Sequence, residues 1–130
     1  MLLGSSSAAI NKTADVGDAV NGSGSQVGIP YSEELIAFTE AAHRLDETLP
    51  NARQALARVV GENGMVDAAV TASIFRSLNI AADASGIRID DHWEEIAADL
   101  ATQTSANQFP TAANSPKVED LVDAMRNNNE

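Results

Sequence analysis

The fold depends most on residues 65–84, whose sequence is MVDAAVTASIFRSLNIAADA. Apolar or small side chains occupy nearly every side of a helix drawn through this stretch, and the polar positions are limited to Asp67, Thr71, Ser73, Arg76, Ser77, Asn79 and Asp83. A helix with so narrow a polar face is normally buried, and its many small residues allow neighbouring helices to approach closely. The stretch therefore predicts a buried central helix, which ends near Gly86 because glycine adopts the left-handed conformation of a helix stop.

Helical signals on both sides of this stretch predict an all-α fold, a small bundle of about four helices plus a short C-terminal helix. Ser32 followed by two glutamates is typical of a helix start and predicts a helix that runs to about residue 46. A second helix opens around Thr48 and is expected to end at Gly61. Asp91 with a glutamate three residues later matches a capping box, which predicts a fourth helix over residues 91–102.

The chain divides into four predicted segments. Residues 1–28 are rich in glycine and serine and are expected to be a flexible leader, and the helical domain follows over residues 29–103. Residues 104–114 are polar and include Pro110, which predicts a linker. Residues 115–127 are expected to form an amphipathic docking helix.

The predicted C-terminal helix has an apolar stripe of four residues, Val118, Leu121, Val122 and Met125. A helix of about 11 residues is shorter than the ~12–15 residues that are marginally stable alone, so this one should fold only by docking. The surface on which it docks belongs either to its own domain or to another chain. The four stripe residues are therefore candidate interface residues.

Composition and charge exclude several classes of protein. The chain has 19 Asp and Glu against 8 Lys and Arg, a formal net charge of −11, and nucleic-acid backbones would repel such a surface. It has no cysteine, which excludes disulfides, thiolate nucleophiles and zinc–sulfur sites. No apolar run approaches the roughly 20 residues that cross a bilayer, and the start of the sequence does not match a secretory signal. We therefore expect a cytoplasmic protein with neither nucleic acid nor membrane as a partner.

The small size of the packed region favours association. A domain of about 60 residues buries only ~60% of its unfolded surface and is marginal alone. A long helix that is apolar on every side also needs neighbours on every side. We expect a homo-oligomer or a complex with a partner chain.

The segment FRSLNIAADASGI, residues 75–87, and its continuation to Asp90 resemble a known helical family. The segment is similar to the last long helix of the alkylhydroperoxidase D-like, or carboxymuconolactone decarboxylase-like, family, in which an alanine-rich helix runs into Ala-Asp-Ala-(Ser or Thr)-Gly-Ile. The order of the helices before it also fits the C-terminal half of that family's domain, so the resemblance covers about residues 33–90. It implies an all-helical fold and an oligomeric assembly.

The chain departs from the family where the family's chemistry is located. Active members use a Cys-x-x-Cys pair and a nearby His in the half that precedes the matching segment, and this chain has no cysteine. Asn79 matches a residue common in the family, whereas Ile80 stands where members often have an arginine. No catalytic residue and no cofactor can be carried over. The missing half is either supplied by a separate chain or lost.

Two further groups of residues are candidate sites. Glu40 and His43 have the Glu-x-x-His spacing of di-iron helical bundles, but one copy supplies only two ligands, so a surface or partly packed histidine is the favoured interpretation. Arg76 and Asp83 lie with Asn79 on the predicted central helix. Buried charges need partners, so these three residues are candidates for an interface or cavity, with structural ion pairing favoured for the two charges.

These observations lead to three functional hypotheses. The favoured one is a cysteine-free, half-length relative of the alkylhydroperoxidase-like family that acts as an oligomeric, non-catalytic or degenerate subunit. The second is a small acidic interaction module that uses its C-terminal helix in a partner's groove. The third is a metal-dependent enzyme assembled from Glu40 and His43 across a dimer.

Overall fold

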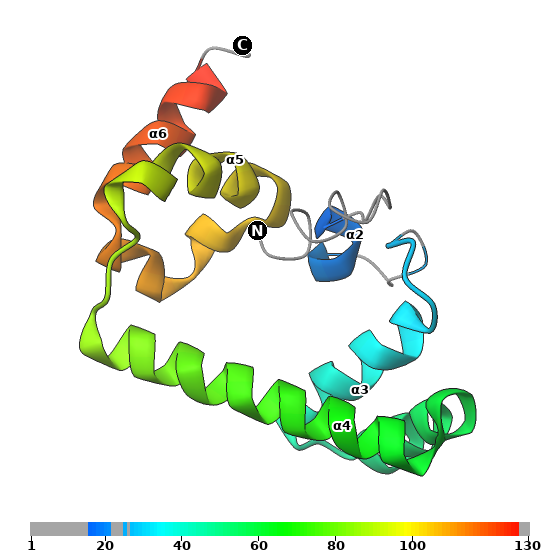
Figure 1. The fold of residues 1–130 in the computed structure, drawn as a ribbon. Helices are drawn as coiled ribbons and strands as arrows, with labels where there is room; N and C mark the ends of the chain where they lie inside the picture. The colour runs from blue at the N-terminus through cyan, green and yellow to red at the C-terminus, as the bar shows by residue number, and fades with distance from the viewer. Residues whose placement is uncertain (1–15, 22–24, 26, 128–130) are drawn as a thin grey trace. The chain divides into compact units, whose positions relative to one another are not determined.

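The computed structural model describes residues 16–21, 25 and 27–127, and within these residues it contains helices and turns but no strand (Figure 1). The predicted all-α class is confirmed. The helices are α2 (Val16–Asn21), α3 (Ser32–Arg44), α4 (Leu49–Ser85), α5 (Glu94–Thr104) and α6 (Pro116–Asn127), with short 3-10 turns η1 (Asp91–Trp93), η2 (Ala106–Gln108) and η3 (Pro110–Asn114).

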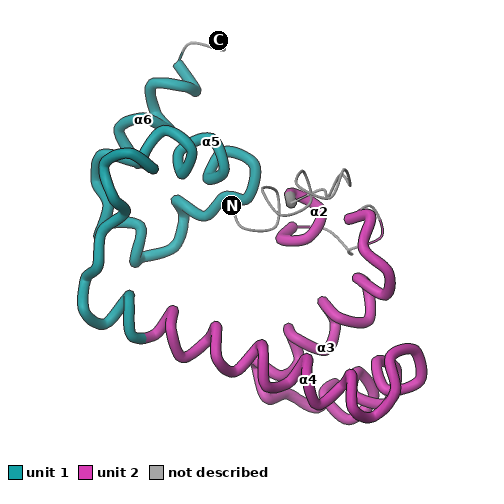
Figure 2. Tube along the Cα trace, viewed as in Figure 1, with its two compact units in different colours: residues 1–2, 81–130 teal, residues 3–80 magenta. Residues whose placement is uncertain are grey.

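The chain separates into two compact units, with the division between Ile80 and Ala81, inside α4 (Figure 2). In chain order, the first unit contains α3 and is labelled unit 2 in Figure 2, and the second unit contains α5 and α6 and is labelled unit 1. This grouping differs from the predicted ranges, because α5 and α6 belong to the same unit whereas the sequence placed them in residues 29–103 and 115–127. The predicted linker 104–114 carries η2 and η3. Of the predicted leader, residues 1–15, 22–24 and 26 lie outside the described part of the chain, and residues 16–21 form α2.

A backbone break at Gly61 divides α4 into a first arm, residues 49–60, and a second arm, residues 62–85. Gly61 has φ 77° and ψ 169°, a conformation that only glycine adopts readily. The predicted helix end at Gly61 is therefore confirmed. Figure 1 shows the chain turning back at this break, so the two arms run in different directions.

The buried side chains of the first unit lie on both α3 and the first arm of α4. Phe38 and Ala41 of α3 and Leu56 of the first arm are each at most 3% exposed, and Val27 is 2% exposed. α3 begins at Ser32, but Tyr31 occupies the N-cap position with a left-handed backbone, φ 60°. The start of the helix was thus predicted correctly, and the capping role given to Ser32 was not.

The core of the second unit joins α5 to α6. Ala98 and Ala101 of α5 pack with Val118 and Val122 of α6, and all four are at most 8% exposed. Leu121 and Met125 are partly buried against the same cluster. The docking surface of the C-terminal helix is therefore on its own chain.

The predicted capping box at Asp91 is wrong. α5 begins at Glu94 after the η1 turn, and no side chain makes a capping hydrogen bond at Asp90 or Trp93, which hold the two N-cap positions. The Asp91 and Glu94 carboxylates instead bind the Nζ atom of Lys117 at 3.2 and 3.3 Å. The two carboxylates thus form an ion pair with α6 in place of a cap on α5.

The prediction that residues 65–84 form the buried centre is also wrong for the single chain. The stretch is helical, but its large apolar residues are exposed by half or more: Val66, Val70, Ile74, Phe75, Leu78 and Ile80. Part-buried residues such as Met65, Ala68 and Ala72 recur on one side of the helix. The described residues of this unit cover that side and leave the opposite side open.

We expect Gly61→Ala to lower the free energy of unfolding by about 1–3 kcal/mol, the cost of holding a side chain in this backbone region. A Cβ atom at Gly61 would meet no atom within 4 Å, so the loss would come from the backbone and not from a clash. Urea unfolding followed by circular dichroism measures the effect. The control is Glu62→Ala, a neighbouring exposed helical position, which should change stability by less than ~0.5 kcal/mol. Equal or greater stability of the Gly61 variant would contradict the proposed role of the break.

Candidate functional site

Four large aliphatic residues form a continuous exposed row along the second arm of α4. Val66, Val70, Ile74 and Leu78 follow one another at intervals of four, which places them in one ridge on the helix surface. Each is between 51% and 59% exposed. We call these four residues the α4 ridge.

A row of small residues lies beside the α4 ridge. Ala69, Ser73 and Ser77 each follow a ridge residue by three positions, so they occupy the adjacent row on the helix. The Ser73 hydroxyl donates a hydrogen bond to the carbonyl of Val70 at 2.8 Å. This hydroxyl is therefore already satisfied within the helix. We call the three residues the α4 small row.

A shallow apolar groove lies on another side of the same arm, against α3. Its volume is about 480 Å³, and its walls include Leu35 and His43 of α3 and Ala68, Ala72 and Phe75 of α4. Phe75 is 54% exposed even though it lines this groove. The groove thus extends the apolar surface of the arm away from the ridge.

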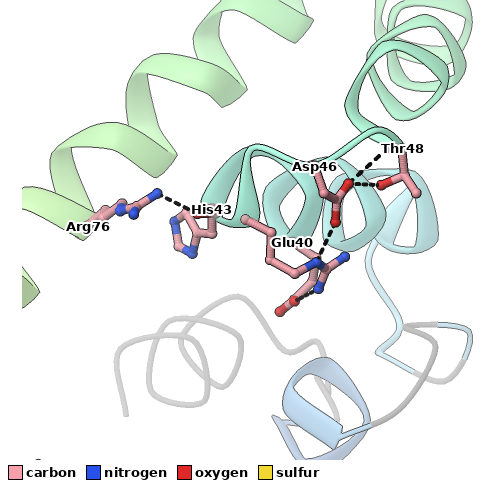
Figure 3. Close-up of polar contacts among 6 residues, drawn as sticks. Glu40, His43, Asp46, Thr48 and Arg76 are labelled. Carbon is pink, nitrogen blue, oxygen red and sulfur yellow. Dashed lines mark hydrogen bonds and ion pairs between the residues drawn. The ribbon is translucent and has the colours of Figure 1, made fainter.

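The three candidate interface residues of this helix, Arg76, Asn79 and Asp83, are all exposed. Arg76 reaches across to α3, where its Nη1 atom donates to the carbonyl oxygen of His43 at 2.7 Å (Figure 3). The partner of Arg76 is therefore a backbone carbonyl, not a carboxylate. The expectation of buried charges on this helix is wrong, because Arg76 and Asp83 are both exposed, although they continue the side of the helix that carries Ala68 and Ala72.

The candidate metal pair Glu40 and His43 lies in a surface network at the end of α3 (Figure 3). The Glu40 carboxylate binds Arg44 at 2.7 Å, and both Glu40 and His43 are exposed. Among the described residues no three His, Asp or Glu side chains come together as a metal ion requires. The part of the chain that the structure describes therefore supplies no third ligand to the pair.

Asp46 is the centre of this network and connects α3 to α4. Its carboxylate accepts hydrogen bonds from Arg44 Nε at 2.7 Å, from the backbone N–H of Thr48 at 2.9 Å and from the Thr48 hydroxyl. These bonds, first of all the one from Arg44, lower the pKa of Asp46 to about 2. Sequence reasoning missed this residue, although an aspartate two positions before a threonine at a helix start is a recognisable local signal.

An open polar hollow of about 820 Å³ lies in the second unit, where η1 and α6 begin. Its walls carry charges of both signs, Arg88 and Lys117 as well as Asp91 and Glu94, and they also include His92. Lys117 donates hydrogen bonds to the two carboxylates. These bonds raise its pKa, and the bond to Asp91 contributes most. The Ser115 hydroxyl accepts a hydrogen bond from the backbone N–H of Ile89 at 3.1 Å. These contacts tie the start of α6 to the start of α5.

The apolar stripe of α6 is covered by α5, unlike the α4 ridge. Val118 and Val122 are buried against α5, and Leu121 and Met125 are partly buried there. A partner could bind this stripe only after α6 leaves α5. The described residues of its own unit leave the α4 ridge open, which makes it the stronger candidate for a functional surface.

No family model matches the chain, and no curated protein or solved structure shows a significant match to it. The resemblance to the alkylhydroperoxidase-like family therefore stays a prediction. Within the described residues, no helix is both long enough and apolar enough to cross a membrane.

We expect Asp46→Ala to destabilise the chain at neutral pH and to lose this effect in acid. The carboxyl has a folded-state pKa of about 2 against 3.8 for the free group, so its contribution is complete above pH 3.8 and is lost as the pH falls toward 2. Urea midpoints of the variant and the wild type, measured at several pH values, should converge as the solution becomes more acidic.

Glu47→Ala removes an exposed carboxylate from the same turn and controls for the loss of one negative charge. Asp46→Asn keeps an oxygen that can accept the Thr48 N–H bond and should fall between the wild type and Asp46→Ala. A destabilisation by Asp46→Ala that is equal at neutral and acidic pH would contradict the role given to the carboxylate.

Proposed function

We propose that the chain is a non-catalytic structural subunit that works as an oligomer. The observation that carries the proposal is the exposure of the large aliphatic residues on the second arm of α4. Fully burying one such side chain contributes roughly 1.5–3 kcal/mol, so several in one row strongly favour association. Contiguous exposed apolar surfaces of more than a few hundred Å² mark interaction sites on proteins.

The absence of cysteine supports the non-catalytic part of the proposal. The family that residues 75–87 resemble carries out its peroxidase chemistry with a Cys-x-x-Cys pair, which this chain cannot form. We therefore propose a half-length, degenerate relative of the alkylhydroperoxidase-like family. The cytoplasmic location expected from the sequence belongs to the same proposal.

The solution mass of the purified chain tests this function. We expect sedimentation analysis at rising protein concentration to give a mass above the 13.6 kDa of one chain. Each copy carries a net charge of −11, so added salt should strengthen the association by screening the repulsion between copies. An interface held by ion pairs would respond to salt in the opposite direction.

A turnover assay with an organic hydroperoxide and a dithiol reductant is the second part of the test. We expect no consumption of peroxide above the rate in buffer. A chain that remains monomeric at the highest concentration reached would contradict the oligomeric part of the proposal. Peroxide turnover by the pure chain would contradict the non-catalytic part.

A further inference from the structure

The α4 ridge and the α4 small row have shapes that complement each other. Helices pack by placing the ridge of one into the groove of the other, and ridges of residues four apart are the commonest contact in globular proteins. Here the ridge consists of Val66, Val70, Ile74 and Leu78, and the adjacent row of Ala69, Ser73 and Ser77 is shallow because its side chains are small. One helix face thus carries both a ridge and a groove that can receive it.

We propose that a second copy of this chain covers the α4 ridge, with each ridge seated in the small row of the other copy. The inference rests on the oligomeric function proposed above and names the surface that forms the contact. A ridge and a groove on one face make the contact isologous, since each copy donates its ridge and receives its partner's. The result is a closed pair with two-fold symmetry.

The charges on the second arm favour a copy of this chain over a charged partner. Between Asp67 and Asp83 the helix has one charged residue, Arg76, and its guanidinium is turned toward the His43 carbonyl. An acidic peptide would form no ion pair along the ridge, and a basic peptide would find only the exposed carboxylate of Asp67 beside Val66 and Val70. Two copies that each carry −11 can meet here because the ridge itself brings no like charges together.

The hydroxyl of Ser73, in the middle of the small row, is compatible with burial in such a contact. The Ser73 hydroxyl already donates to the Val70 carbonyl, so covering it leaves no donor unsatisfied. Larger residues at Ser73 or Ser77 would fill the groove and hold the two helices apart. The contact therefore requires small side chains at these two positions.

The available area predicts a reversible pair. Residues 65–80 extend for about 22 Å along a helix roughly 11 Å across, so one face offers roughly 400 Å² per copy. The total for two copies falls below the ~1,200 Å² above which stable complexes are found. We expect the pair to form on concentration and to dissociate on dilution.

Two variants of the full chain test the proposal by sedimentation velocity over a range of concentrations. Ile74→Glu places a charge in the middle of the ridge and should raise the dissociation constant at least ~10-fold. Ser77→Leu adds apolar surface but fills the groove, and it should also raise the dissociation constant. Non-specific hydrophobic association would instead become stronger with Ser77→Leu.

Phe75→Glu is the matched control. Phe75 is as exposed as Ile74, at 54% against 53%, and the substitution adds the same charge to the same arm. Its side chain is directed about 100° round the helix axis from Ile74, away from the small row. We expect this variant to associate like the wild type. Circular dichroism and thermal unfolding at low concentration establish that each variant keeps its helices.

The outcomes separate this inference from the proposed function. A wild-type chain that never associates overturns both the oligomeric function and the pairing through the ridge. If Ile74→Glu then destabilises this monomer, the ridge is covered by another segment of the same chain. A wild-type oligomer that Ile74→Glu leaves intact, or that Ser77→Leu tightens, overturns only the inference. If only Phe75→Glu abolishes association, the contact lies in the groove beside α3. This result would also overturn the proposal that the copies pair through the ridge.

Discussion

The second arm of α4 has apolar side chains on opposite sides, and the described residues of its unit cover only one of them. The covered side includes Met65, Ala68 and Ala72, while the α4 ridge faces away from these residues. Exposed aliphatic surface of this extent is costly in water, because its hydration is unfavourable in proportion to area. The arm is therefore the part of the molecule that most needs a partner.

The arm is positioned by two local features of the backbone. The break at Gly61 ends the first arm and lets the second run in another direction, so that both can lie against α3. The hydrogen bonds of Asp46 with Arg44 and Thr48 fix the linker between α3 and α4. The contact from Arg76 to the His43 carbonyl then joins the second arm to the end of α3. These features set which side of the arm is covered and hence which side is left for the ridge.

The helices could be predicted from the sequence because their signals are local. Glu33 and Glu34 mark the first turn of α3 and Gly61 marks the break in α4, and each acts through its own backbone or nearest turn. The burial of residues 65–84 could not be predicted in this way, since an apolar pattern shows that a face needs cover and not which chain supplies it. The capping role of Asp91 failed for a related reason. Its partner, Lys117, is 26 residues away, and only the folded α5–α6 pair brings the two together.

The α4 ridge is visible in the sequence as four large aliphatic residues at intervals of four. The apolar pattern predicts burial for the whole helix and does not separate the ridge from the side that is covered, and the interface candidates that it offers on this helix are polar: Arg76, Asn79 and Asp83. Asp46 was also missed, although its relation to Thr48 is local. The stripe of α6 was recognised correctly, and the structure decides between the two docking surfaces that the sequence left open, in favour of α5.

Backbone hydrogen exchange of the full chain, followed by mass spectrometry at low and at high protein concentration, tests the self-association of α4 most directly. If copies pair through the ridge, amides of residues 65–80 exchange more slowly at the higher concentration, while those of α5 and α6 exchange at the same rate at both. The self-association of α4 would be contradicted if the amide exchange rates of residues 65–80 did not depend on concentration, or if only the amides of α6 exchanged more slowly.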